Sequence, residues 1–414
     1  MKLDIAQRSW VIYDMGNAAY ALIVRTVFAA LLFKYCANDI WGEENTTAYW
    51  GYVCSLAGIA AGAVSITLGF YADKHHCKKL CLALFVLIGA LSTAAFSLLQ
   101  KGMAWSVLCL SFISLGCYMS ANSFYDSLLL AVAPSSLRDR LSSLAYALGY
   151  IGGVIPFIIC LVLRYILDDP GSADRIAFII AAAWWLFLTV PSLIFVKEDK
   201  NAKERDKSLD FLANFKSLLK NRNVLLFLVA YFLYIDGVGT IYTMAAPIAT
   251  DIGINTVQLL AVILGLQFLA FPCTLLYGRL SSKFHPRNLV LFAIGIYVLI
   301  SLLALFLTIP VLREYRLHIF IFLAVLIGTS QGGIQSLSRS LFSRIVPSAQ
   351  AAEFFGFYNL FGKFTTIVGP LFIGTVAACG GKAELGIAFL AVPFMLGALL
   401  LTRVDFTPPG MRSR

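Results

Sequence analysis

Gly69-Phe-Tyr-Ala-Asp73-Lys74 and Gly278-Arg-Leu-Ser-Ser282-Lys283 stand 209 residues apart and share one pattern. In each stretch a glycine is followed four residues later by a polar residue and then by a lysine, just after an apolar segment. The recurrence predicts that the same loop occurs once in each half of the chain. If the chain contains a repeat, other pairs must recur at a similar offset.

Further pairs do recur, in the same order along the two halves. They are Pro134-Ser135 with Pro347-Ser348, Gly149 with Gly362, Asn122 with Gln335 and Asp126 with Arg339, all 213 residues apart, and Asp14 and Tyr20 with Asp236 and Tyr242, 222 residues apart. Because these matches keep their order across equal numbers of apolar segments, they indicate a duplicated six-helix unit. Both copies have the same orientation, which predicts parallel repeats related by an axis along the membrane normal.

The composition is that of a membrane protein. Of the 414 residues, 60% are hydrophobic and 13% are charged, and the mean hydropathy is +0.83. Soluble domains have roughly 45–50% apolar and about 25% charged residues. At about 20 residues per transmembrane helix plus a connection, the chain has room for about twelve spans and no further domain. This excludes a secreted enzyme, a nucleic-acid-binding domain and a receptor with a large folded head.

A polar stretch from Lys197 to Arg222 separates two sets of six apolar segments. The segments run approximately over 10–34, 49–71, 80–99, 103–132, 141–167 and 173–196, and then over 223–251, 256–282, 287–311, 316–346, 352–379 and 383–403. They predict an all-α membrane protein with a six-helix bundle over 1–196, a cytoplasmic linker over 197–222 and a second bundle over 223–414. In the linker, Leu212, Phe215 and Leu219 recur at helical spacing and indicate a short amphipathic helix at the membrane interface. A solvated linker turn is the alternative.

Basic residues are unevenly distributed between the predicted loops. With the amino terminus in the cytoplasm, 23 of the 32 Lys and Arg residues fall on the cytoplasmic side and 7 on the other, while Arg25 and Lys363 fall inside spans. The bias predicts that both termini are cytoplasmic. The first apolar stretch begins near Trp10, is about 25 residues long and lacks a small-residue cleavage site, so we expect a retained span and no signal peptide.

Five stretches resemble the major facilitator superfamily of secondary transporters and, within it, the vacuole-effluxer-like branch. They are Trp10-Val-Ile-Tyr-Asp14-Met-Gly-Asn17-Ala-Ala-Tyr20, Ala147-Leu-Gly149-Tyr150-Ile-Gly152-Gly153, Asp236-Gly237-Val-Gly-Thr-Ile-Tyr-Thr-Met244-Ala-Ala, Gln331-Gly332-Gly333-Ile-Gln335-Ser-Leu-Ser338-Arg339-Ser and Ala352-Glu353-Phe-Phe-Gly356-Phe-Tyr358-Asn359-Leu-Phe-Gly362-Lys363-Phe. The resemblance covers nearly the whole chain, and the last two stretches are the most specific. The chain departs from the superfamily pattern at His75-His76-Cys77, where a glycine and an arginine are usual, and at Ser282, which replaces the second acid.

The resemblance implies a major facilitator fold and transport by alternating access between two rocking halves. It also implies small organic solutes, with amino-acid export the best-known activity of the branch. We therefore expect a small-molecule substrate, coupling to protons, a lipid bilayer as surroundings and a monomer. Short loops and the absence of appended domains favour a bacterial inner membrane.

The resemblance also places the loop of Asp73 and Lys74 in the gate of such a transporter. Glu353, at the start of the eleventh span, is expected to cap the amino end of that helix or to pair with Arg344. The residues expected in the gate are Asp14, Asp73, Lys74, Arg339 and Glu353.

Ionisable side chains inside the predicted spans are costly and mark candidate sites for substrate or coupling. Asp14 and Arg25 lie eleven residues apart, roughly 16 Å along one helical face, so they cannot contact each other. The guanidinium of Arg25 would suit a substrate carboxylate. An interhelical salt bridge is the alternative.

Polar pairs occupy the fourth and tenth spans, which, with the first and seventh, line the path according to the superfamily resemblance. Asn122 and Asp126 are four residues apart and share a helical face, as do Gln331 and Gln335. Both pairs are therefore expected near the midplane, where such transporters bind substrate. Arg339 matches Asp126 in the repeat with the opposite charge. This predicts a cytoplasmic ion pair that breaks when the halves separate; pairing of each with a neighbouring loop is the alternative.

Two charged residues occupy the middle of later spans. Asp236 lies about 20 Å into the seventh span, where burial disfavours the charged form of a carboxyl group, so it is predicted to carry a proton. A helix break at Asp236-Gly237, with the side chain as a cap, is the alternative. Lys363 has Asn359 one turn before it and is predicted to bind an anionic substrate group or to pair with Asp236 or Asp14. Protonation of Asp236 would then free the lysine and couple protons to substrate.

The sequence contains no recognisable motif for catalysis or for a metal. Nine cysteines are predicted as small core residues, and His75 and His76 are poor metal ligands because they are adjacent in a basic loop. We therefore expect no metal, no cofactor and no enzymatic activity. Two other classes compete with a carrier. A membrane-embedded enzyme acting on lipid-linked substrates needs an acidic or histidine-rich cluster, and a passive channel needs a symmetric oligomer.

Overall fold

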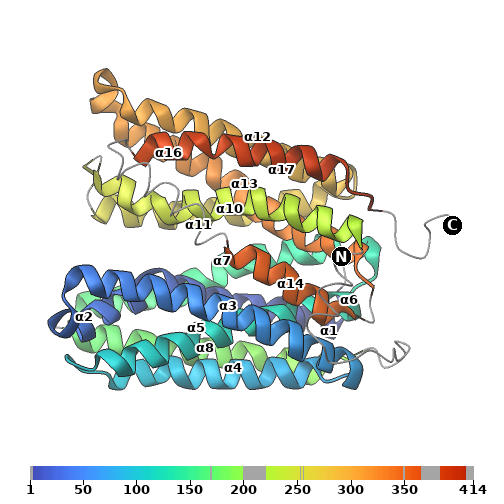
Figure 1. The fold of residues 1–414 in the computed structure, drawn as a ribbon, viewed down its shortest axis with the longest axis horizontal. Coiled ribbons are helices and arrows are strands. Elements are labelled where there is room, and N and C mark those ends of the chain that lie inside the picture. Colours follow the sequence, from blue (N-terminus) through green and yellow to red (C-terminus); the bar gives the residue numbers. More distant parts are fainter. Residues whose placement is uncertain are drawn as a thin grey trace. The chain divides into compact units, whose positions relative to one another are not determined.

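The structure is a computed structural model that describes residues 3–167, 170–198, 221–251, 253–254, 256–347, 350–364 and 383–406. All regular structure in these ranges is helical (Figure 1). The first half contains α1 (Ile5–Ala19), η1 (Tyr20–Phe28), α2 (Ala29–Trp41), α3 (Glu43–His75), α4 (Lys78–Ala95), η2 (Phe96–Leu98), α5 (Ala104–Ser127), α6 (Leu129–Val132), α7 (Ser135–Ile166) and α8 (Pro170–Phe195). The second half contains α10 (Arg222–Asp251), α11 (Thr256–Leu280), α12 (Pro286–Leu303), η3 (Ala304–Thr308), η4 (Pro310–Tyr315), α13 (Arg316–Ile345), α14 (Ala351–Phe364), α16 (Ala383–Phe389) and α17 (Ala391–Thr402).

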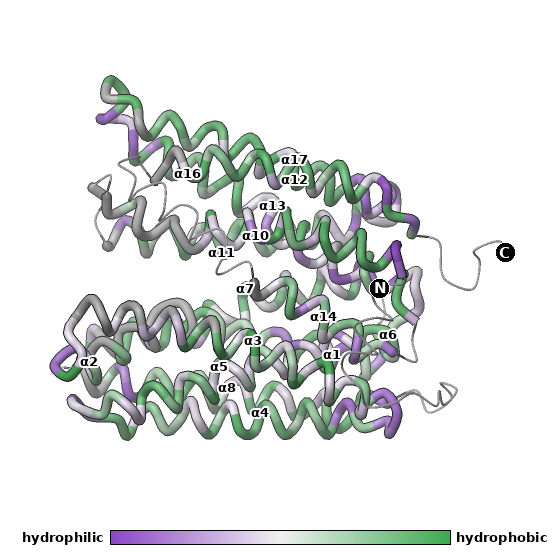
Figure 2. The backbone as a smooth tube through the Cα atoms, in the orientation of Figure 1, coloured by the Kyte–Doolittle hydropathy of each residue, from purple (hydrophilic) through white to green (hydrophobic). Residues whose placement is uncertain are grey.

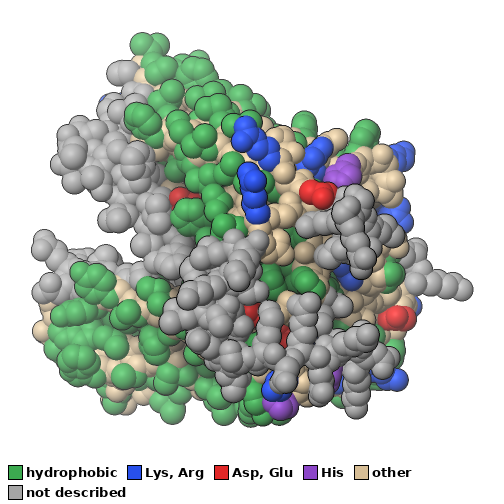
Figure 3. All heavy atoms as spheres, turned by 45° about the vertical axis from the view of Figure 1, so that its right-hand side comes forward, with side chains coloured by type: hydrophobic (Ala, Val, Ile, Leu, Met, Phe, Trp, Pro, Cys, Tyr) green, Lys and Arg blue, Asp and Glu red, His purple; other side chains and the backbone are tan. Residues whose placement is uncertain are grey.

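Nine helical stretches within the described ranges are long and apolar enough to cross a membrane. Hydrophobic residues follow the length of the helices and hydrophilic residues gather at helix ends (Figure 2). Large apolar side chains also face outward, as Figure 3 shows; Phe187 is 74% and Trp105 is 69% exposed. Lipid surrounds such side chains without penalty, whereas backbone polar groups must be paired within the helix. The linker helix predicted over 208–220 and the part of the eleventh segment over 365–379 lie outside the described residues.

The first predicted span contains a change of helix type. The π-helical segment η1 separates α1 from α2 without interrupting the helical path. π-Helical turns widen a helix, and they occur frequently at functional sites. Arg25 lies on η1, although its side chain is outside the described part of the structure.

Packing divides the chain into two compact units, each built mostly from one half of the sequence and completed by a short segment of the other. Unit 1 comprises Met1–Pro134, Leu148–Phe211 and Ser348–Leu360, and unit 2 comprises Ser135–Ala147, Leu212–Pro347 and Phe361–Arg414. The first residues of α7 therefore pack with second-half helices, and the first residues of α14 pack with first-half helices. Both exchanged segments begin at the serine of a repeated Pro-Ser pair.

Within unit 1, α7 approaches α1 closely through its glycines. A Cβ added at Gly152 would lie 2.4 Å from the Cβ of Met15, closer than real side chains come. Small residues allow helix backbones to approach in this way within a membrane. The contact fixes α1, and with it Asp14, against α7.

Gly152→Val is expected to destabilise the protein by about 1–3 kcal/mol, because overpacking forces backbone shifts. The melting temperature in detergent would fall. Gly295→Val on α12 is the matched control, because an added Cβ there meets nothing within 4 Å. Equal melting temperatures for the two variants would contradict the close packing of α1 and α7.

Candidate functional site

Two of the predicted site residues meet in unit 1. Asn359 on α14 donates a hydrogen bond from its Nδ2 to Oδ2 of Asp126 on α5, at 3.0 Å. The same amide also donates to the carbonyl of Phe355. Asp126 is only 6% exposed, so this carboxylate lies in a largely dry environment. Asn122, one turn earlier on α5, is 9% exposed.

An aromatic stack positions Asp126. Tyr125 stacks against Trp10 with ring centroids 4.6 Å apart and against Tyr13 with centroids 4.2 Å apart. The indole Nε1 of Trp10 also donates to the Tyr125 carbonyl, at 3.0 Å. These contacts fasten α1 to α5 beside the carboxylate, and all three rings are almost fully buried. This stack was not predicted from the sequence, although Trp10 and Tyr13 stand in the stretch around Asp14 that carries the family resemblance.

The Gly69–Lys74 stretch forms a contact with the start of α14. The carboxylate of Asp73 accepts hydrogen bonds from the backbone N–H groups of Ala352 at 3.3 Å and Glu353 at 3.0 Å. A Cβ at Gly69 would lie 2.8 Å from the Ala352 carbonyl oxygen, so the glycine makes room for this approach. A helix start presents unpaired N–H groups and partial positive charge, and a carboxylate there satisfies both.

Lys78 is the cation that neutralises Asp73. Its Nζ lies 2.6 Å from Oδ1 of Asp73, and both side chains are mostly buried. Lys74, which the family resemblance places in the gate, is exposed. At the start of α14, Asp73 caps the amide of Glu353, which is itself 2% exposed. Lys78, four residues after Lys74, thus completes the contact between Asp73 and the start of α14.

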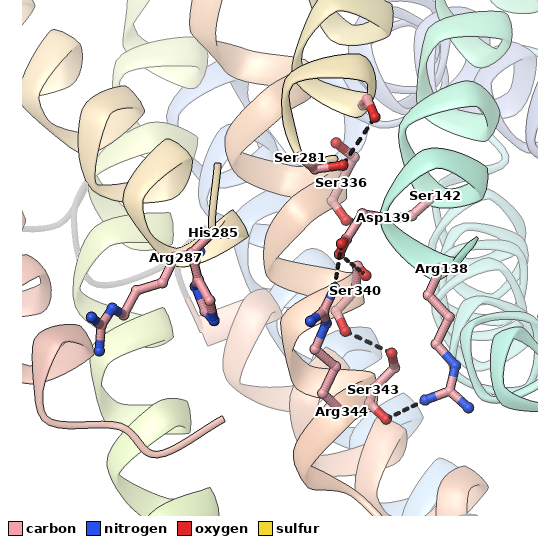
Figure 4. A network of polar contacts seen from close by, with 11 residues as sticks. Arg138, Asp139, Ser142, Ser281, His285, Arg287, Ser336, Ser340, Ser343 and Arg344 are labelled. Carbon is pink, nitrogen blue, oxygen red and sulfur yellow. Dashed lines mark hydrogen bonds and ion pairs between the residues drawn. The ribbon is translucent and has the colours of Figure 1, made fainter. Parts of the chain in front are cut away.

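A second polar network joins α7 to α13 within unit 2 (Figure 4). The Asp139 carboxylate pairs with Arg344 and accepts a hydrogen bond from the Ser340 hydroxyl. Arg138 donates to the carbonyl of Ser343 at 2.9 Å, and Ser142 donates to the carbonyl of Ser336 at 2.7 Å. Asp139 is 3% exposed, so its pairing is needed to offset its burial.

Asp139 stands between Arg138 and Arg140 in the sequence, and the positive charge of this loop conceals its role. Arg344 was expected as a possible partner of Glu353. In the structure, Arg344 forms an ion pair with Asp139. An acidic residue within a basic loop was the feature of the sequence that could have indicated this ion pair.

Arg339 also lies in this network and is 2% exposed. Its Nε donates to the Ser142 hydroxyl at 2.9 Å and its Nη2 donates to the Ser142 carbonyl at 3.1 Å. The guanidinium carbon lies 4.4 Å from the centroid of the Tyr146 ring, which is cation–π geometry. Arg339 therefore fastens the start of α7 to α13. Its predicted pairing with Asp126 stays a prediction.

The predicted residues of the seventh span lie on an unbroken helix. α10 continues through Asp236-Gly237, so the alternative of a helix break at this position is wrong. Gly237 instead accommodates a ring of α17, since a Cβ there would lie 2.4 Å from Phe394. Asp236 and Asp14 are each 7% exposed, so both carboxylates lie in the interior.

The remaining candidates are described in part. The side-chain oxygen Oε1 of Gln331 is buried without a hydrogen-bond partner, and Gln335 is partly buried one turn later on α13. Lys363 lies on α14 one turn after Asn359, but the side chains of Lys363 and Arg25 are outside the described part of the structure. Among the described residues, no three His, Cys, Asp or Glu side chains are grouped as a metal site would require.

His285 stands in the loop before α12, beside the α7–α13 network (Figure 4). Burial lowers the pKa of His285 from its usual 6.5, and the positive charges of Arg344 and Arg287 lower it further; Asp139 opposes this effect. The imidazole is therefore neutral at physiological pH, and its Nδ1 accepts from the backbone N–H of Arg287 at 3.2 Å.

Arg344→Gln is expected to raise the pKa of His285 toward 6.5, because it removes a neighbouring positive charge and leaves Asp139 uncompensated. A histidine NMR titration of the protein in nanodiscs measures the shift. Arg313→Gln, which removes an equal charge from η4 at the far end of α13, should leave the titration unchanged. A His285 titration that is identical in Arg344→Gln and wild type would contradict the arrangement.

Comparison with known proteins agrees with this architecture. A model of the family described as vacuole effluxer Atg22 like matches residues 40–408. The chain is 36% identical over 411 residues to the uncharacterized MFS-type transporter YxiO of Bacillus subtilis, covering 96% of this chain and 94% of YxiO. It is 26% identical over 389 residues to autophagy-related protein 22 of Eremothecium gossypii, covering 83% of this chain and 75% of that protein.

Solved structures show the same fold at low identity. The proton:xylose symporter XylE, bound to 6-bromo-6-deoxy-D-glucose, matches with a TM-score of 0.76 at 14% identity, covering 96% of this chain and 95% of XylE. The human organic anion transporter MFSD10 matches with a TM-score of 0.74 at 15% identity, covering 96% and 99%. The chain is thus a multi-pass membrane protein with the major facilitator fold, and it belongs to the vacuole effluxer Atg22-like family of transporters.

Proposed function

We propose that this chain is a proton-coupled secondary transporter of amino acids that works by alternating access. The observation that supports it best is the exchange of helix starts between the two units. Ser135–Ala147 of α7 packs with second-half helices, and Ser348–Leu360 packs with first-half helices. Each exchanged segment is fastened by a buried carboxylate, Asp139 in one case and Asp73 in the other.

Contacts of this kind suit a gate. Removing one partner of a buried ion pair costs about 3–5 kcal/mol, because the other charge is left unpaired. Separating both partners into water costs far less, since each is then solvated. A water-filled opening can therefore break the Asp139–Arg344 pair and the hydrogen bonds of Asp73 to the α14 amides reversibly. The same contacts keep the helix starts in place when water is excluded. The predicted ion pair of Asp126 with Arg339 would belong to the same gate, together with Asp14, Lys74 and Glu353.

The charges predicted along the path favour a zwitterionic substrate. Arg25 and Lys363 would receive a carboxylate, and Asp126 would balance an ammonium group. Asn122, Gln331, Gln335 and Asn359 supply neutral hydrogen-bonding groups. Proton uptake by Asp236 would release Lys363 for the substrate and so couple the two fluxes.

The distribution of basic residues supports cytoplasmic placement of both termini. We propose two six-helix halves, 1–196 and 223–414, joined by the linker over 197–222. In this arrangement the contacts of Asp73 and Asp139 lie at the cytoplasmic side of a bacterial inner membrane, and one chain forms one pathway as a monomer.

Counterflow in proteoliposomes tests the proposal. Wild type is expected to exchange at least one labelled amino acid from a pool, and Lys363→Ala is expected to abolish exchange by removing the anion partner. Asp236→Asn should retain exchange and lose its dependence on pH. Lys101→Ala is the control, because Lys101 is an exposed residue paired with exposed Asp39. Folded wild-type protein that exchanges no amino acid would overturn the amino-acid assignment.

Asp139→Asn is expected to open the α7–α13 contact. If the contact weakens by about 1.4 kcal/mol, the open fraction rises about tenfold. A cysteine placed at Ser336, which is fully buried against α7, reports opening through its alkylation rate in a cysteine-free background. Asp39→Asn removes the same charge from an exposed ion pair, where little effect is expected. Equal alkylation rates in the two variants would refute a gating role for Asp139.

A further inference from the structure

Two glutamine side chains in unit 2 have a buried carbonyl oxygen with no hydrogen-bond partner. They are Gln267 on α11 and Gln331 on α13, and the atom without a partner is Oε1 in both. Gln267 is 7% exposed. A buried acceptor without a donor costs about 1–3 kcal/mol, and hydrocarbon offers no water to satisfy it. A ligand that supplies donors to both oxygens would remove both costs.

The register of α11 and α13 places the two amides at similar positions along the helix axes. A Cβ at Gly328 would touch the carbonyl oxygen of Leu266, and a Cβ at Gly333 would touch the ring of Tyr277. Residue numbers thus rise together along both helices, so the helices are parallel and tightly packed. Gln267 is level with Gly328, and Gln331 is three residues further along, roughly 4.5 Å at 1.5 Å per residue.

The two amides also lie on the same side of the helix pair. Successive residues of an α-helix are rotated by 100° about its axis. On α11, Gln267 is therefore about a quarter turn from the side that contacts α13. On α13, Gln331 is about a third of a turn from the side that contacts α11, and this rotation has the opposite sense. On parallel helices, rotations in opposite senses lead to the same flank. The side chains therefore converge beside the α11–α13 seam.

This flank of α13 faces α10. Ser338, two turns from Gln331 on the same helical face, shares a 2.7 Å hydrogen bond with the Tyr234 hydroxyl of α10. Seven residues back along α13 and seven forward along α10 bring Gln331 level with Ile241, the neighbour of Thr240. The Thr240 hydroxyl is fully buried and also has no partner.

We propose that Gln267 and Gln331 form the acceptor side of a subsite for the protonated amino group of the transported solute. This rests on the proposed function and names the substrate group that the second half recognises. An ammonium group presents three donors and no acceptor. It therefore matches two amide oxygens that lack donors.

Gln267→Leu separates this role from a structural one. Replacing a buried group that lacks a partner by an apolar group of similar size is neutral or stabilising, so the variant is expected to fold with an unchanged or higher melting temperature. In counterflow, its apparent affinity for an amino acid that wild type exchanges should fall about tenfold or more. Inhibition by the same carboxylic acid without its amino group should be unchanged, so discrimination between the two is reduced.

Gln258→Leu is the matched control, because it makes the same substitution at an exposed position of α11. Gln331→Leu provides a second variant. When it is combined with Gln267→Leu, the loss of binding free energy should be smaller than the sum of the two single losses, since both glutamines act on the same ammonium group. Unchanged discrimination in Gln267→Leu, with active wild type, overturns this inference alone. Absence of exchange in folded wild type overturns the proposed function, and the inference with it.

Discussion

A charge buried in a membrane protein must be neutralised within the protein, and the described contacts of this chain are organised by that requirement. Asp73 is neutralised by Lys78 and by the backbone amides at the start of α14. Asp139 is neutralised by Arg344 and the Ser340 hydroxyl. In both cases a carboxylate fastens the start of a helix to helices from the other half of the sequence, so the cost of burying the charge is offset by the same contacts that define the units.

Close packing of small residues makes these contacts possible. Gly69 lets the start of α14 reach Asp73, and Gly152 lets α7 lie against α1. Along α7 and α13, serines place short hydroxyl groups where longer side chains would separate the helices. Dispersion forces and hydrogen bonds must replace the hydrophobic effect between helices in lipid, and both require short distances. Polar atoms that close packing leaves without partners, as at Gln267 and Gln331, then become candidates for contact with a solute.

Much of the fold could be predicted before the structure. The apolar segments predict the positions of the long helices, and the family resemblance predicts the major facilitator fold, which the matches to XylE and MFSD10 confirm. In the candidate site, Asn359 donates a hydrogen bond to Asp126, and both residues were predicted from the sequence as site residues. The helix break at Asp236-Gly237 was a wrong alternative, because a glycine that makes room for a neighbouring ring has the same local sequence as a glycine that ends a helix.

The sequence by itself determined the class, the spans and the family of this protein, since hydropathy is summed over about twenty residues and motifs are local. Only the tertiary structure showed that Lys78 pairs with Asp73, that Asp139 pairs with Arg344, and that Tyr125 stacks between Trp10 and Tyr13. All but the first of these contacts join residues more than 100 positions apart. They depend on the rotation of each helix about its axis, which is set by the packing of every neighbour together and is not encoded in any single segment.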